Sequence, residues 1–215
     1  MALVLDGSAN TIGGLAVGGL PDGIVDTDML ATNAVGTAKI ADNAVTAAKA
    51  TGISPWTRNA AFSPPSVQVS EVVDVGSIPA DAVEILVEWT DISSSGNEDL
   101  CFQFGTSGGI VTSGYNSRDS YTVDSGNSVV QNRASVVRVS IDASTSNSVS
   151  GYMRMHHVNG NVWVYHGMAE SSNQTGRQGV FTGDVSLGGA LTTIRFRCNG
   201  DSGFDTGTAR VSWRV

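Results

Sequence analysis

A serine followed by two glycines is the first feature of this sequence that could support nucleophilic catalysis. Residues 105–109 read Gly-Thr-Ser-Gly-Gly, which formally matches the Gly-x-Ser-x-Gly pattern. That pattern serves catalysis when a strand-to-helix turn exposes the serine above a parallel sheet, but residues 110–117 have no helical periodicity. We therefore interpret the segment as a turn after a strand, in which glycine supplies a positive φ angle.

A second serine lies in residues 200–204, Gly-Asp-Ser-Gly-Phe, which is similar to the nucleophile loop of chymotrypsin-like proteases. Phe204 stands where those proteases need a second glycine, and their preceding Ala-His-Cys segment is absent. The carboxylates are scattered through predicted loops, whereas glycoside hydrolases need a closely placed pair. The sequence therefore predicts that the protein is not an enzyme.

Histidines and aspartates offer two candidate metal sites. In a hairpin built on the Asn159-Gly160 turn, His157 and His166 share one face but lie four rows apart, about 13 Å at 3.3 Å per residue. Asp201 and Asp205 could bind Ca²⁺, but without a loop of further oxygen ligands we interpret them as turn residues. We expect no metal and no cofactor within one chain. Three copies of one histidine on a threefold axis remain an open alternative.

Residues 112–121 hold the best candidates for recognition. Tyr115, Arg118, Asp119 and Tyr121 fall in what reads as one polar loop, and exposed tyrosine with arginine suits contacts to sugars or protein surfaces. A second polar stretch, 171–179, contains Arg177 but no aromatic residue. The alternative for both segments is an ordinary solvated loop.

The elements that must position these residues read as strands. Turn residues separate eight runs with β character, and no segment has a convincing helical pattern. This set predicts an all-β protein whose C-terminal part is an antiparallel sandwich or jelly roll, with the last strand tied into a sheet. The predicted strands are 66–75, 83–89, 100–105, 135–141, 151–158, 161–168, 191–198 and 209–215.

The hairpin around Asn159-Gly160 can be predicted in detail, because Asn-Gly favours a two-residue type I′ turn. Such a turn pairs His156 with Trp163 and Met155 with Val164. One face then carries Tyr152, Arg154, His156, Trp163 and Tyr165, and the other carries Met153, Met155, His157, Val162, Val164 and His166. We expect the Met/Val face to point into the core, although the aromatic residues would suit a core as well.

The N-terminal quarter has a different pattern. Within residues 33–49 the unit Asn-Ala-Val recurs after ten positions, and one large apolar residue follows about every five. Neither a helix nor a strand gathers that spacing on one face. A segment with so little bulk must bury these residues against copies of itself or another protein. We therefore predict a stalk, with a disordered linker as the alternative. Its apolar residues are Val25, Leu30, Val35, Ile40 and Val45.

Composition sets limits on partners and on the domain boundaries. The net charge is −8, which disfavours a nucleic-acid-binding surface. The glycine-interrupted N-terminus does not resemble a signal peptide, and no run is long enough to cross a membrane. We expect three parts: an anchoring segment at 1–19, the repeat stalk at 20–55 and the sandwich at 56–215. Cys101 and Cys198 are expected to be buried free thiols, although a disulfide remains possible.

Parts of the chain resemble fibre proteins of tailed bacteriophages. Residues 76–117 look like the opening of a jelly-roll domain in such fibres, with an Ile-Pro start, a Ser/Gly/Asn loop and a Gly-x-Ser-Gly-Gly strand end. Residues 191–213 are similar to the closing strand pair of that family, and residues 18–35 with the repeats resemble its stalks. The resemblance touches about half of the chain and implies a trimeric virion protein.

These observations lead to an expected function. We expect a structural tail fibre, assembled in the host bacterial cytoplasm and carried on the virion. It would attach to another virion protein through its N-terminus and bind a host-surface glycan or protein through its sandwich. A head fibre or decoration protein is the close alternative. A polysaccharide-degrading tailspike and a secreted carbohydrate-binding module are the remaining ones.

Overall fold

The computed structural model divides the chain into two compact units, Met1–Ile53 and Ser54–Val215. In the first unit, β1 (Val4–Asp6) pairs antiparallel with β2 (Thr11–Gly13). The structure describes residues 4–6, 11–13, 32, 35–36, 40, 44–45, 49, 56–63, 72–122, 128–139, 148–172 and 178–215.

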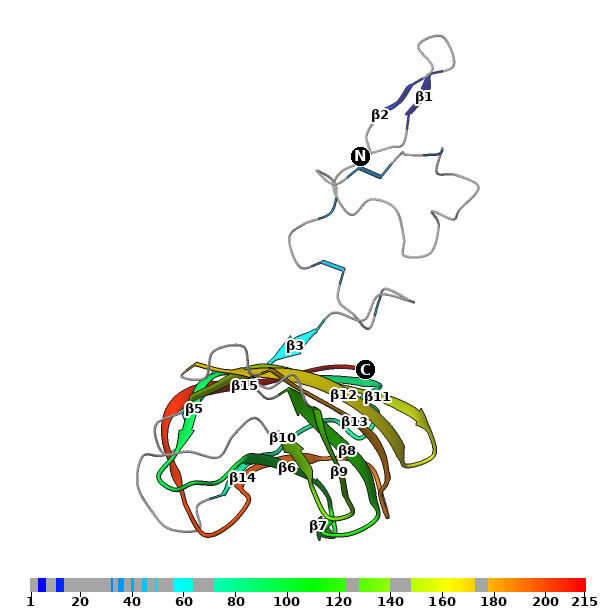
Figure 1. Cartoon of the computed structure of the whole chain (residues 1–215). Coiled ribbons are helices and arrows are strands. Elements are labelled where there is room, and N and C mark those ends of the chain that lie inside the picture. The colour runs from blue at the N-terminus through cyan, green and yellow to red at the C-terminus, as the bar shows by residue number, and fades with distance from the viewer. Residues whose placement is uncertain are drawn as a thin grey trace. The chain divides into compact units, whose positions relative to one another are not determined.

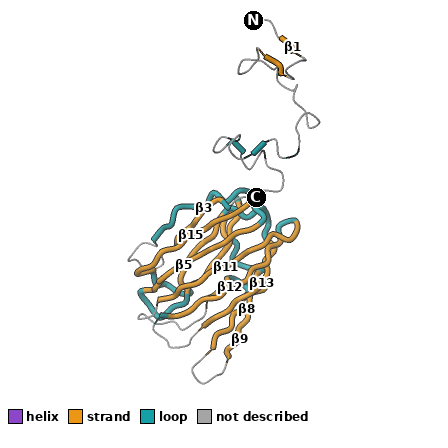
Figure 2. Tube along the Cα trace, turned by 90° about the horizontal axis from the view of Figure 1, so that it is seen from above, coloured by secondary structure: helices purple, strands orange, loops and turns teal. Residues whose placement is uncertain are grey.

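The second unit is an antiparallel sandwich of two sheets that face each other (Figure 1). The larger sheet has eight strands, which lie side by side in the order β3-β15-β5-β11-β12-β13-β8-β9 (Figure 2). Their bounds are β3 Thr57–Arg58, β5 Glu84–Ser94, β8 Tyr115–Thr122, β9 Ser128–Arg133, β11 Ser148–Asn159, β12 Val162–Ser171, β13 Gln178–Ser186 and β15 Phe204–Arg214.

The smaller sheet has five strands in the order β10-β6-β14-β4, with β7 paired to β6. Their bounds are β4 Val73–Val75, β6 Leu100–Thr106, β7 Gly109–Ile110, β10 Val137–Val139 and β14 Thr193–Cys198. Each of the eight predicted segments overlaps one of the described strands, and no α-helix occurs in the described part of the chain. The predicted all-β sandwich is therefore confirmed. The last strand, β15, pairs with β5 as expected.

The core between the two sheets is rich in aromatic side chains. Trp89 on β5 lies 5.1 Å from Phe102 on β6, measured between ring centroids. Tyr165 on β12 meets Phe104 edge-on at 5.6 Å. Such inclined contacts suit the ring quadrupoles, and each ring also removes a large apolar area from water. These rings join the larger sheet to the smaller one.

Among the strands of the sandwich, the sequence prediction missed β8, β9 and β13 and the two-residue strands β3 and β7. The residues of β8 were interpreted as a polar loop because they are mostly polar. In the structure this strand pairs with β13 along seven residues and with β9 along six. The prediction of a loop at 112–121 was therefore wrong, and residues 171–179 enter β13 at Gln178.

The hairpin of β11 and β12 forms, but one residue out of the predicted register. His156 is paired with Val164 and His157 with Trp163, because an irregularity between His157 and Asn159 adds a residue to one strand. Gly160 has a φ of 51° in the turn. The shift moves the aromatic residues Trp163 and Tyr165 into the core.

The register shift of one residue also explains which side chains of the hairpin are buried and which are exposed. Met153 and Met155 are fully buried, as predicted for the core face. Val164 and His166 were predicted to share that face, but they are exposed on the opposite one. A slip of one residue turns over every side chain of a strand, since side chains alternate with period two.

Cys101 and Cys198 are free and buried, as the sequence predicted. Cys101 is the register partner of Arg197, and Cys198 is the partner of Leu100. Register partners share a face, so the two thiols point to opposite faces of the smaller sheet. Burial raises the pKa of each thiol to about 12. Neither thiol is therefore activated for chemistry at neutral pH.

Three of the five predicted stalk residues lie within the described residues. Val35, Ile40 and Val45 expose 52%, 41% and 54% of their surfaces in the single chain. Val25 and Leu30 lie outside the described residues. The large apolar residues at five-residue spacing are therefore uncovered wherever the single chain is described.

Candidate binding surface

Tyr115 belongs to the core and not to an exposed recognition loop. Its side chain is only 4% exposed. Its hydroxyl accepts a hydrogen bond from the Phe104 backbone N–H at 2.8 Å and donates to the Val111 carbonyl at 2.9 Å. Burial raises the pKa of this phenol to about 12. The predicted stacking role of Tyr115 is therefore wrong.

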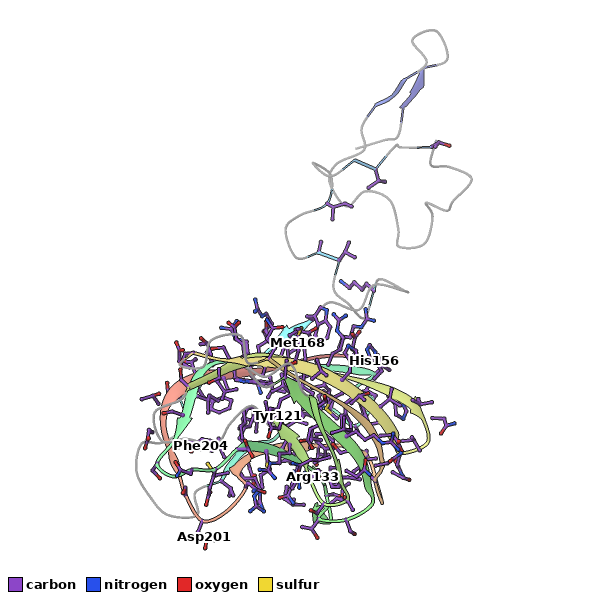
Figure 3. All side chains as sticks on the ribbon, in the orientation of Figure 1. Tyr121, Arg133, His156, Met168, Asp201 and Phe204 are labelled. Carbon is purple, nitrogen blue, oxygen red and sulfur yellow. The ribbon has the colours of Figure 1, made fainter. Side chains whose placement is uncertain are left out.

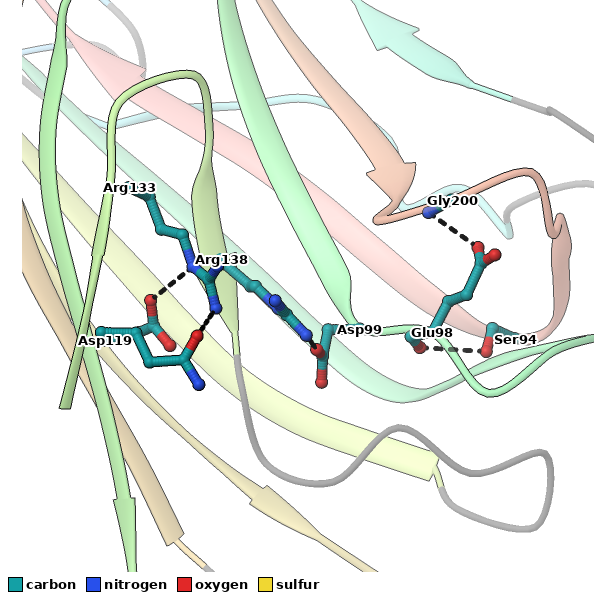
Figure 4. Close-up of polar contacts among 8 residues, drawn as sticks. Ser94, Glu98, Asp99, Asp119, Arg133, Arg138 and Gly200 are labelled. Carbon is teal, nitrogen blue, oxygen red and sulfur yellow. Dashed lines mark hydrogen bonds and ion pairs between the residues drawn. The ribbon is translucent and has the colours of Figure 1, made fainter. Parts of the chain in front are cut away.

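Asp119 is also buried, at 1% exposure, so its predicted contact with a receptor is wrong as well. Its carboxylate accepts a hydrogen bond from Arg133 Nε at 3.3 Å, and Arg133 also bonds Gln131. A second pair, Asp99 with Arg138, lies next to it (Figure 4). Both carboxylates are thus buried beside an arginine, which lies on β9 in one pair and on β10 in the other.

Arg118 is the predicted recognition residue that does face solvent. It alternates with the buried Ser117 and Asp119 along β8, so its side chain lies on the outer face of the larger sheet. Among the described residues it makes no hydrogen bond or ion pair. Tyr121 is half-buried on the inner face (Figure 3), and Arg177 lies outside the described residues.

The two serine motifs have structural roles. Ser107 lies in the short turn between β6 and β7, and the next strand begins at Gly109, which has a φ of 113°. Ser202 lies in a loop held by Glu98, whose carboxylate accepts the backbone N–H groups of Gly200, Asp201 and Ser202 at 2.9–3.0 Å. Figure 4 shows the bond to Gly200.

The described residues contain no group of three or more histidine, cysteine, aspartate or glutamate side chains placed to hold a metal ion. Asp201 is exposed at the tip of the Glu98-bound loop (Figure 3). Asp205 is part of β15. His157 and His166 were predicted to share a face but lie on opposite faces of the sheet. His156 and His166 share the outer face instead, with ring centroids 6.0 Å apart.

The outer face of the larger sheet carries a row of apolar side chains across five adjacent strands. Each is the register partner of its neighbour, so all of them point the same way. At about 4.8 Å between strands, the row spans about 19 Å. Four members expose 38–64% of their surfaces, and Figure 3 places Met168 on this outer side. The apolar row comprises Tyr152, Met168, Val180, Ser120 and Val130, with Ser120 its one polar member.

A shallow hollow of about 470 Å³ lies over the apolar row. Its walls include the row itself and three polar residues from the next row along the sheet, His166, Thr182 and Arg118. Thr182 is engaged, since its hydroxyl donates to the Tyr165 carbonyl at 3.2 Å. The hollow therefore has an apolar floor and one guanidinium without a partner among the described residues.

Several other charges of this face are paired. Glu84 is only 4% exposed and accepts contacts from Arg214 at 2.6 Å and Arg154 at 3.1 Å. His156 Nδ1 lies 3.8 Å from the same carboxylate. Arg58 lies 3.6 Å from Glu88. Arg118 differs from these three arginines in having no partner among the described residues, a feature that it shares with Arg210 of the same face.

No family model, curated protein or solved structure matches this chain. No described helix has the length and apolarity needed to cross a membrane. The outer face of the larger sheet, with its apolar row and Arg118, is therefore the candidate binding surface.

Proposed function

We propose that this chain is a non-enzymatic fibre subunit of a tailed-bacteriophage virion. It assembles as a homotrimer through its repeat segment, joins another virion protein through residues 1–19, and presents the sandwich to a host surface. The observation that carries the proposal is the exposure of Val35, Ile40 and Val45 in the single chain. Exposed large apolar residues at regular spacing indicate a surface that another chain covers.

The outer face of the sandwich supports the attachment role. Sites on rigid strands hold their geometry better than sites on loops, and the apolar row lies on a sheet of eight strands. Trimerisation would place three copies of the hollow on one particle, which turns weak contacts into avid binding. The resemblance of residues 76–117 and 191–213 to phage fibres points the same way.

Electron microscopy with an antibody against the sandwich tests the virion role. We expect label on projections of the particle, either at the tail or at the capsid, which separates a tail fibre from a head fibre. Particles that carry no label would contradict the proposal. Host polysaccharide that becomes shorter on incubation with the purified protein would instead assign the chain to the enzymatic tailspikes.

A further inference from the structure

We infer that the hollow over the apolar row binds a carboxylate-bearing saccharide, such as a polymer that contains uronic acid. The inference deepens the proposed attachment role, because it names the chemical class of the host-surface ligand. It rests on the shape of the hollow, on the chemistry of its floor and on Arg118, which has no partner among the described residues.

The floor suits the apolar side of a sugar ring. Tyr152 offers an exposed aromatic ring at one end of the row, and Met168 and Val180 continue the apolar surface beside it. The C–H face of a pyranose packs on such surfaces, while its hydroxyl groups stay at the open, hydrated side. A volume of about 470 Å³ falls within the usual range of small-ligand sites.

Arg118 gives the site its charge preference. A guanidinium presents two parallel N–H groups that match a carboxylate, and such charge-assisted pairs are stronger than neutral hydrogen bonds. The Cα of Arg118 is the register partner of Thr182, which places the two side chains beside each other in the row next to Val180. The chain as a whole carries a net charge of −8, so an acidic ligand needs such a local cation.

The alternative occupant is the same face of a second copy of this chain. A symmetric contact would bring two Arg118 guanidinium groups into the same region, without an unpaired acid from the described part of the hollow to neutralise them. An acidic saccharide satisfies both the apolar floor and the guanidinium, so the observations favour it.

Isothermal titration of the full-length protein with cellobiouronic acid and with cellobiose tests the inference. We expect the acidic disaccharide to bind at least tenfold more tightly than the neutral one. Arg118→Gln should weaken binding of the acid roughly 10- to 100-fold and leave binding of cellobiose unchanged. Tyr152→Ala should weaken both.

Arg58→Gln is the matched control, because Arg58 is an exposed arginine of the same face whose guanidinium already lies near Glu88. It should bind the acid as the wild type does, and thermal melting should confirm that all variants are folded. Equal affinity for the two disaccharides, or no binding of either up to millimolar concentration, would overturn the inference. Loss of self-association in Tyr152→Ala would do the same and assign the hollow to a second copy.

The proposed fibre role and the proposed saccharide ligand are tested independently of each other. Antibody label on virions together with no saccharide binding would retain the fibre and discard this ligand class. Saccharide binding without label on any virion would retain the site and discard the fibre.

Discussion

At the residue scale, the Tyr115 hydroxyl joins β8 to the smaller sheet by satisfying two backbone groups in the core. Tyr115→Phe leaves the buried Phe104 N–H without its acceptor, and such a group costs about 1–3 kcal/mol. We therefore expect the free energy of unfolding to fall by about that amount, measured by urea titration. Tyr121→Phe is the control, since Tyr121 lies half-buried on the same strand.

Asp99 gives the pH dependence of stability a defined sign. Burial raises the pKa of its carboxyl above 3.8, and Arg138 only partly opposes this. Between the ordinary pKa of the unfolded state and the raised pKa of the native state, the native state holds more protons than the unfolded state. The contribution of Asp99 to the free energy of unfolding therefore falls as the pH rises through this range.

We accordingly expect Asp99→Asn to become more stable relative to the wild type as the pH rises from about 4 through the raised pKa. Unfolding titrations at several pH values measure this difference. Asp201→Asn, on an exposed loop, is the control. A relative stability that declines with rising pH would mean that the attraction of Arg138 outweighs burial.

At the element scale, the loop before β15 depends on one carboxylate. Glu98 accepts three backbone N–H groups of residues 200–202, and bonds to a charged acceptor are worth more than neutral ones. Glu98→Ala should lower the free energy of unfolding by about 1–3 kcal/mol. Chemical denaturation measures the loss, and Asp201→Ala in the same loop should change stability by less than about 0.5 kcal/mol. Similar losses in both variants would show that Glu98 is not what holds the loop.

The repeat segment yields a second prediction at this scale. Replacing Val35, Ile40 and Val45 together with serine removes the large apolar residues that we place between chains. Each buried one contributes about 1.5–3 kcal/mol, so limited proteolysis should cut the segment faster, while the sandwich stays resistant. Replacing Ala44 alone with serine should leave the pattern of fragments unchanged. Unchanged resistance in the triple variant would favour the disordered linker.

Sequence reasoning found the strands whose side chains follow a clear apolar alternation. It missed β8, because Ser117 and Asp119 put polar residues on the inner face of that strand. Asp119 is tolerated there because Arg133, fourteen residues later, lies beside it. The sequence offers no local sign of this pairing.

The candidate site could be predicted only in part. Arg118 was identified from its type, but the apolar row joins strands β11, β12, β13, β8 and β9, which are not consecutive in the chain. Finding it requires the order of the strands in the sheet. The hairpin register was off by one because a bulge near Val158 is not encoded in the Asn-Gly turn signal.

At the scale of the whole molecule, the chain combines a segment whose described large apolar residues are exposed with a sandwich that has its own core. The two units differ in how their large apolar residues are covered. The sandwich buries aromatic residues between its two sheets, whereas the described repeat residues are exposed, and we propose that other chains cover them. Assembly of three chains through the repeat segment is therefore the central claim.

Sedimentation equilibrium of the full-length protein at micromolar concentration tests that claim most directly. We predict a single species of about 67 kDa, three times the 22.2 kDa of one chain. The variant with serine at positions 35, 40 and 45 should shift toward the mass of one chain. A wild-type protein that sediments as a monomer of 22.2 kDa would contradict the account.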